Sequence, residues 1–124
     1  MCVIVQRVIA DYNTGSLMDV SIVITVLNEE NTISPLLLSI YRQKHKPSEV
    51  IIVDGGSHDK TVLKILEFSK KHKRFPVHLI EEKGNISHGR NTGIAAAKSK
   101  IIALIDGGCI AKSHWLSYLV KPFA

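Results

Sequence analysis

Carboxylate side chains lie where apolar runs of the sequence end. Asp54 and Asp106 each follow directly after such a run, and Glu29 lies three residues beyond a third run, Val20–Val26. A carboxylate at the end of a strand can accept hydrogen bonds from a base or a ribose hydroxyl, or hold a divalent cation that neutralises phosphate. The pattern therefore predicts a ligand site that contains Asp54 and Asp106. The alternative is that each aspartate binds its own turn.

A glycine and an arginine accompany these carboxylates. Gly55 follows the first aspartate directly, and a residue without a Cβ atom permits close approach of a ligand, although it equally suits a plain turn. Arg90 lies in the turn predicted at the start of a helix, where its guanidinium could grip a diphosphate with two hydrogen bonds. An ion pair with Glu81 or Glu82 is the alternative for this arginine.

Several well-known site motifs are missing from the sequence. There is no G-x-G-x-x-G after the first apolar run, no G-x-x-x-x-G-K-[ST] loop and no G-x-S-x-G elbow. Dinucleotide cofactors, P-loop chemistry and serine-hydrolase chemistry are therefore disfavoured. The six histidines show no metal spacing, and Cys2 and Cys109 indicate neither a disulfide framework nor a zinc knuckle, so a reducing, cytoplasmic setting is expected.

Apolar runs and helical patterns alternate along the chain. The strands are expected at 20–26, 50–53, 77–80 and 100–105. Helices are expected from Ser34 to about Gln43, after a cap at Asp59, from Ser87, and over 113–120. Such alternation is typical of an α/β fold with a parallel sheet and helices on both faces. Ligands bind these sheets at the carboxyl ends of the strands.

The length of 124 residues leaves room for one domain, and the net charge of +5 favours polyanionic partners. Residues 1–17 form an N-terminal extension, either an extra strand or a start-site artefact, ahead of a functional fold at 18–124. The basic run 70–74 could contact a membrane, but cations at a helix end in a solvated turn are the simpler interpretation. Aromatic residues do not alternate with basic ones, so nucleic-acid binding is not expected.

Four segments resemble, in order, the motifs of family 2 glycosyltransferases with the GT-A fold. These segments, at 20–30, 53–61, 89–94 and 104–109, are VSIVITVLNEE, VDGGSHDKT, GRNTGI and LIDGGC. The match extends over residues 19–123. The resemblance implies a Rossmann-like nucleotide-binding half with a mainly parallel sheet in the order 3-2-1-4.

The resemblance also implies roles for particular residues. The base and ribose of a nucleoside-diphosphate sugar would meet the first loop and the Asp54 loop, at Thr25, Leu27, Glu29, Asp54 and Gly55. Arg90 would lie near the diphosphate. Asp106 would meet the ribose and the Mg²⁺ or Mn²⁺ ion that bridges the diphosphate, and the metal would stabilise charge on the departing nucleoside diphosphate.

Two departures from the family pattern bear on these roles. Gly55 stands where many members have a second aspartate, and Gly108 stands where the D-x-D motif has its second aspartate. The family's acceptor-binding half follows the segment that matches the end of this chain, so no catalytic base is assigned. The expected function is a cytoplasmic donor-binding half that transfers a sugar to a lipid phosphate or a glycan. A non-catalytic binding or assembly module is the alternative.

Loss of the second half of a GT-A sheet would expose an apolar edge or helix face. A homo-oligomer that covers this surface is therefore expected.

Overall fold

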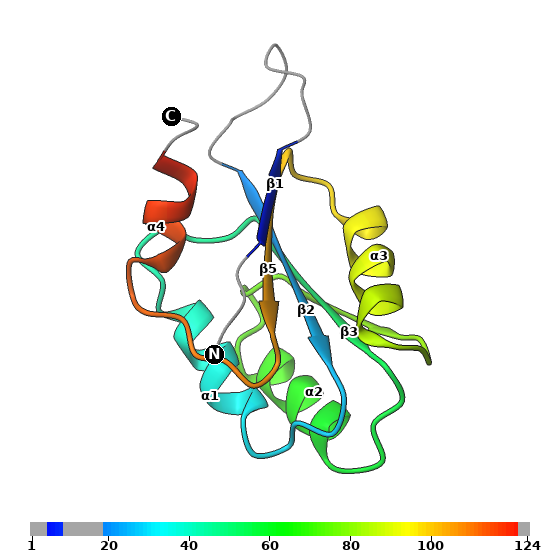
Figure 1. The fold of residues 1–124 in the computed structure, drawn as a ribbon. Helices are drawn as coiled ribbons and strands as arrows, with labels where there is room; N and C mark the ends of the chain where they lie inside the picture. Colours follow the sequence, from blue (N-terminus) through cyan, green and yellow to red (C-terminus); the bar gives the residue numbers. More distant parts are fainter. Residues whose placement is uncertain (1–4, 9–18, 122–124) are drawn as a thin grey trace.

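A five-stranded sheet forms the centre of the computed structural model, which describes residues 5–8 and 19–121. Its strands lie in the order β1-β5-β2-β3-β4 (Figure 1). The strand bounds are β1 Val5–Val8, β2 Val20–Val26, β3 Glu49–Asp54, β4 Val77–Glu81 and β5 Ile101–Asp106. Strands β2 to β5 pair in parallel, and counting them along the chain gives the order 3-2-1-4, which confirms the sequence prediction.

Strand β1 adds an antiparallel edge to this parallel sheet. Its residue Val5 pairs with Leu104 of β5, and Val8 pairs with Ile101. The structure thus shows a strand at Val5–Val8, within the predicted extension 1–17. The remainder of that extension, and the proposed boundary at residue 18, lie outside the described residues, so the division of the chain stays a prediction.

Helices cover both faces of the sheet, as predicted (Figure 1). Their bounds are α1 Ile33–Tyr41, α2 Thr61–Lys71, α3 Ile86–Ala96 and α4 Trp115–Val120. Side chains from α1, α2 and α4 pack with one face of the strands in one apolar cluster, while Ile94 of α3 packs on the other face against Val23 and Ile51. No helix in the described part of the chain is both long and apolar enough to cross a bilayer.

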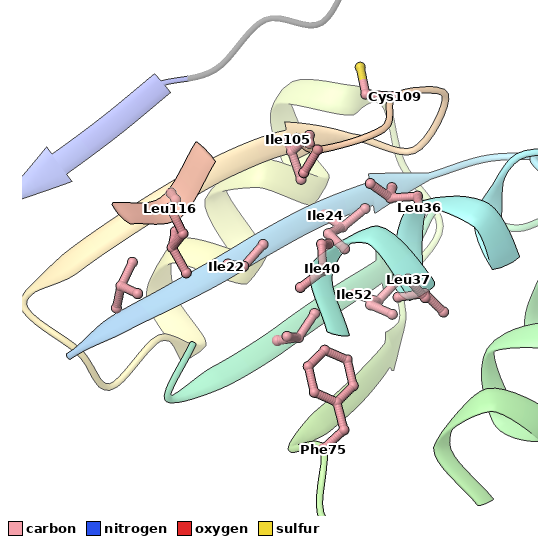
Figure 2. Close-up of a cluster of buried hydrophobic side chains, with 14 of the residues drawn as sticks. Ile22, Ile24, Leu36, Leu37, Ile40, Ile52, Phe75, Ile105, Cys109 and Leu116 are labelled. Carbon is pink, nitrogen blue, oxygen red and sulfur yellow. The ribbon is translucent and has the colours of Figure 1, made fainter. Parts of the chain in front are cut away.

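Alternating strand residues build the larger cluster. Ile22 and Ile24 of β2 face α1, whose Leu36, Leu37 and Ile40 are fully buried against the sheet (Figure 2). Because successive residues of a strand point to opposite faces, Val23 lies in the second cluster. The near-continuous Val and Ile runs thus reflect burial on both faces of a parallel sheet.

Helix α3 packs unusually close to β2 because a glycine faces the strand. A Cβ atom on Gly93 would come within 2.4 Å of Val23 Cγ1. Glycine inside a helix normally costs about 1 kcal/mol relative to alanine. The structure shows why it is there, since any larger residue would push α3 away from the sheet.

Helix starts differ from the predicted ones by one to two residues. Helix α1 begins at Ile33, so Ser34 lies inside it and does not cap it. Helix α2 begins two residues after Asp59, whose Oδ1 accepts from the Thr61 N–H at 2.9 Å. Helix α3 is capped by Asn85, which accepts from the His88 N–H, and not by Ser87. Several Ser, Asn and Asp residues near each start compete as caps, and tertiary contacts choose among them.

Candidate functional site

A cleft of about 840 Å³ opens at the carboxyl ends of β2, β3 and β5. This is the edge at which parallel α/β sheets bind ligands. Four segments far apart in the sequence line the cleft, namely the loops after β2, β3 and β5 and the start of α3. The lining residues are Thr25, Val26, Leu27, Glu29, Val53, Gly55, Gly84, Asn85, Ile86, Ser87, Gly89, Asp106, Gly107, Gly108 and Cys109.

The structure brings five of the seven predicted site residues to this cleft. Thr25, Leu27, Glu29, Gly55 and Asp106 line it, whereas Asp54 and Arg90 do not. Leu27 is exposed at the cleft, which leaves an apolar side chain free for a flat ligand group. Asp54 contacts the loop that follows it, and Arg90 pairs with the lining residue Asp106.

The Asp54 carboxylate binds its own loop. Its side chain is almost fully buried, with 3% exposure. Oδ2 accepts from the N–H groups of Gly56 and Ser57 at 3.1 and 3.0 Å, and Oδ1 accepts from the Ser57 hydroxyl at 2.5 Å. The structure therefore shows the turn aspartate that was the alternative interpretation of this residue.

Asp54 also connects two loops of the cleft through Ser57. The Ser57 Oγ atom accepts from the Asn28 N–H at 2.8 Å, and the Asn28 Oδ1 atom accepts from the His58 N–H at 2.8 Å. Asn28 itself has a positive φ of 53°, which Asn tolerates better than most residues. The loop after β2 is thus held against the loop after β3, and Asp54 is the anchor of that arrangement.

Arg90 and Asp106 form an ion pair. Arg90 Nη2 lies 2.8 Å from Asp106 Oδ1, and the two side chains are 31% and 34% exposed. Arg90 lies in α3, four residues after the helix begins at Ile86. Its partner is neither Glu81 nor Glu82, and Glu82 instead pairs with the His88 ring at 3.0 Å. The pair places a guanidinium beside the carboxylate that ends β5.

Glu29 lies against the loop that follows Asp106. Its Oε2 accepts from the Thr32 hydroxyl at 2.6 Å, and that hydroxyl also lies 3.1 Å from the Gly107 carbonyl oxygen. A Cβ atom on Gly108 would lie 3.8 Å from both Glu29 carboxylate oxygens. An aspartate at this position, as the D-x-D pattern has, would therefore bring a second negative charge toward Glu29.

The carboxylates of the cleft do not fit a metal ion held by the protein. In the described ranges, no group of three or more His, Cys, Asp or Glu side chains is arranged to hold a metal. Asp106, the predicted ligand, is already paired with Arg90. Gly108 supplies no side chain where the family motif has its second carboxylate.

One carboxylate near the cleft has a displaced pKa. Burial raises the pKa of Asp59, but hydrogen bonds from the Thr61 hydroxyl and N–H and from the Glu30 N–H outweigh it, so the pKa lies below its ordinary value. Glu29 donates its own N–H to the same Thr61 hydroxyl oxygen at 2.8 Å. Asp59 thereby helps to fix the loop after β2 against the start of α2.

Sequence reasoning missed the segment in which the loop after β4 leads into the first residues of α3. Gly84, Asn85, Ile86 and Ser87 line the cleft, and Ile86 is a large exposed apolar residue. The capping pattern of Asn85 was a usable signal, because a helix that follows a parallel strand begins at the ligand edge. Cys109 also lines the cleft and is disulfide-bonded. The prediction of no disulfide was wrong, so the cysteines no longer support a reducing setting.

Fold and cleft together define a GT-A-like domain, and comparison with known proteins gives its family. The model of the family described as Glycosyl transferase family 2 matches residues 21–124. The chain belongs to this family. A glycosyltransferase AglE from Haloferax volcanii is 33% identical over 105 residues, and the uncharacterized glycosyltransferase EpsJ from Bacillus subtilis is 33% identical over 102.

These relatives are longer than the chain. The alignments cover 83% and 82% of the chain but 34% of AglE and 29% of EpsJ, so the chain spans about a third of their length.

Solved structures show the same fold. S. aureus TarS 1-349 in complex with UDP-GlcNAc superposes with a TM-score of 0.72 at 22% identity, over 83% of the present chain and 30% of that TarS fragment. The mannosyltransferase PcManGT from Pyrobaculum calidifontis, in complex with GDP-Man and Mn²⁺, gives a TM-score of 0.69 at 26% identity. That match covers 73% of the chain and 28% of PcManGT.

Proposed function

We propose that the chain is the donor-binding part of a glycosyltransferase and that a nucleoside-diphosphate sugar occupies the cleft at the carboxyl ends of β2, β3 and β5. The observation that carries this proposal is the Arg90–Asp106 ion pair at the end of β5. A guanidinium suits a diphosphate, and a carboxylate suits a ribose hydroxyl. The cleft volume of about 840 Å³ also suits a ligand of this size.

The loops after β2 and β3 are the proposed place of the base and ribose. Thr25, Leu27 and Glu29 come from the first loop, and Gly55 comes from the second. Leu27 offers an apolar contact to the face of the base. Asp54 acts as a positioning residue, because its carboxylate holds residues 56 and 57 and, through Ser57, the loop after β2.

In this proposal, donor binding separates Arg90 from Asp106, and each side chain binds the donor instead. The diphosphate carries more charge than one carboxylate and draws the Arg90 guanidinium toward itself. Asp106 then becomes free to accept a hydrogen bond from the ribose. Since both side chains are about one-third exposed, separating them costs little free energy.

In this proposal, a divalent cation binds only together with the donor. PcManGT is described in complex with GDP-Man and Mn²⁺. In the present chain Asp106 is the one predicted ligand, and it is engaged by Arg90. The residues do not fit a resident metal, and no step of the proposed binding passes through one.

The acceptor and the complete reaction belong to the proposal as well. The relatives are called glycosyltransferases, and the chain covers about a third of each. A lipid phosphate or a glycan remains our proposal for the acceptor. No residue of this chain is assigned as the base that would deprotonate it.

Isothermal titration calorimetry tests the donor site directly. Titrations with UDP, GDP, UDP-GlcNAc and GDP-mannose, each with and without Mn²⁺, should show saturable binding of at least one nucleotide. Binding should weaken in Asp106→Asn and persist in Lys121→Gln, which removes an exposed charge at the end of α4. Absence of binding at millimolar nucleotide, or equal affinity in Asp106→Asn and the native chain, would contradict the proposal.

A non-catalytic binding or assembly module is the second candidate. Gly55 and Gly108 favour this candidate, because they replace two carboxylates of the family pattern. The Asp54 carboxylate also favours it, because its oxygens accept hydrogen bonds from their own loop. An assay for release of sugar from the donor separates the candidates. Turnover that Asp106→Asn abolishes would exclude the module, and donor binding without turnover supports it.

A further inference from the structure

A dense group of cationic residues lies at the edge of the sheet opposite the cleft. Segments 42–46 and 70–74 carry seven of the 16 Lys and Arg residues, which leaves nine elsewhere against 11 Asp and Glu residues. We call these two segments the basic edge. The seven are Arg42, Lys44, Lys46, Lys70, Lys71, Lys73 and Arg74, and all of them are exposed. The positive net charge of the chain therefore originates here.

Packing around Tyr41 brings the two segments together. The Tyr41 ring centroid lies 4.4 Å from that of His72 and 5.5 Å from that of Phe75. Lys46 Nζ lies 5.5 Å from the same ring and donates a hydrogen bond to the Tyr41 carbonyl oxygen at 2.6 Å. The 42–46 segment, which continues directly from Tyr41, is thus held against the 70–74 segment around His72.

The topology places the basic edge away from the cleft. Segment 42–46 connects α1 to β3, and segment 70–74 connects α2 to β4. Both therefore lie at the amino ends of parallel strands, whereas the cleft lies at the carboxyl ends. The seven cations form no ion pair among the described residues, and Glu67 is the sole carboxylate on α2.

Helix α2 adds apolar side chains to this cationic surface. Leu63 and Leu66 are 52% and 53% exposed. Lys70 follows Leu66 by four residues and Leu63 by seven, so the three side chains share one face of the helix. Exposed leucines beside a cluster of cations are the features of a helix that lies in a membrane interface.

We infer that the basic edge and the outer face of α2 dock on an anionic phospholipid surface. Lysine and arginine pair with lipid phosphates, and Leu63 and Leu66 insert between the headgroups. A nucleic acid suits this surface less well, because the Tyr41 ring, although 39% exposed, already packs against His72 and Phe75 and has Lys46 Nζ 5.5 Å from its centroid. This inference does not depend on the proposed donor site.

Vesicle co-sedimentation tests the inference. The chain should bind phosphatidylcholine vesicles that contain phosphatidylserine, should not bind vesicles of phosphatidylcholine alone, and should be released by salt. Each lysine near an anionic surface contributes roughly fivefold to binding, so Lys71→Gln/Lys73→Gln should bind roughly 25-fold more weakly. The matched control Lys83→Gln/Lys98→Gln removes two exposed lysines outside both the basic edge and α2 and should bind as the native chain does.

A second variant distinguishes lipid from nucleic acid. Leu63→Ser/Leu66→Ser keeps every charge, and both sites are exposed, so circular dichroism should show an intact fold. Its vesicle binding should fall severalfold. Equal weakening of both lysine variants, no binding to phosphatidylserine vesicles at low salt, or a leucine variant that binds vesicles normally would overturn the inference. If this leucine variant binds vesicles normally and polyuridylate binding depends on Lys71 and Lys73, the surface binds nucleic acid instead.

Discussion

The role of a side chain in the cleft depends on its neighbours in space more than on its position in the sequence. Asp54 was predictable as a residue at a strand end, because the run of buried Val and Ile before it is unmistakable. The role of Asp54 was not predictable. Whether its carboxylate binds a ligand or its own turn depends on where the N–H groups of Gly56 and Ser57 lie. Gly56 has φ +110°, a conformation that its sequence context alone does not reveal.

The ion pair of Arg90 leads to a prediction for binding. Arg90→Ala should raise the Kd for a nucleoside diphosphate roughly 10- to 100-fold, because a charge-assisted hydrogen bond contributes about 1.5–3 kcal/mol. The thermal midpoint should change little, since the pair is partly exposed. Calorimetry on Arg90→Ala, on Arg90→Lys and on the distant control Arg42→Ala measures this. Arg90→Lys should be intermediate, and an alanine variant that binds as tightly as the control would refute the assignment.

Strands were the most predictable elements, and helix starts were the least. Unbroken apolar runs indicate parallel strands, and the bounds of all four parallel strands were predicted within two residues. Helix α1 instead starts after Thr32, whose side chain makes no capping hydrogen bond and whose hydroxyl contacts the Glu29 carboxylate and the Gly107 carbonyl oxygen 75 residues away. No local pattern encodes such a contact. The cleft segment at residues 84–87 was missed for a related reason, since its place follows from the topology.

The contact between α3 and β2 makes a prediction about stability. Gly93→Ala would gain about 1 kcal/mol of helix propensity, but the new Cβ meets Val23 Cγ1, and overpacking costs about 1–3 kcal/mol. We expect a net loss of about 1 kcal/mol in urea unfolding. In a Val23→Ala background the same exchange should become neutral or stabilising. An identical effect in both backgrounds would show that the contact does not limit packing.

The start of α2 predicts a pH dependence. The pKa of Asp59 in the folded chain is lowered, so its contribution to stability is present above the unfolded value, 3.8, and is lost as pH falls through the folded value. Asp59→Asn should therefore lower the urea midpoint at pH 7. The difference from the native chain should shrink on acidification below pH 4. A difference that is the same at pH 7 and at pH 3 would rule out this linkage.

At the scale of the whole molecule, the sheet keeps an open edge at β4. This strand pairs with β3 on one side, and in the described residues no strand covers its other side. Open edges pair readily with another chain, and we propose self-association through this edge. Light scattering at high protein concentration should give a mass well above the 13.7 kDa of one chain. A mass of one chain at every concentration would count against the proposal.

Donor binding in the cleft requires that a nucleotide sugar contact the carboxyl ends of the strands and not the basic edge. An NMR titration of the ¹⁵N-labelled chain with UDP-GlcNAc and GDP-mannose tests this most directly, because every backbone amide reports on its own surroundings. We predict saturable shift changes at Gly55, Asn85, Gly107 and Gly108, which line the cleft. Shifts confined to residues 70–74, or no shifts at millimolar donor, would rule out donor binding in the cleft.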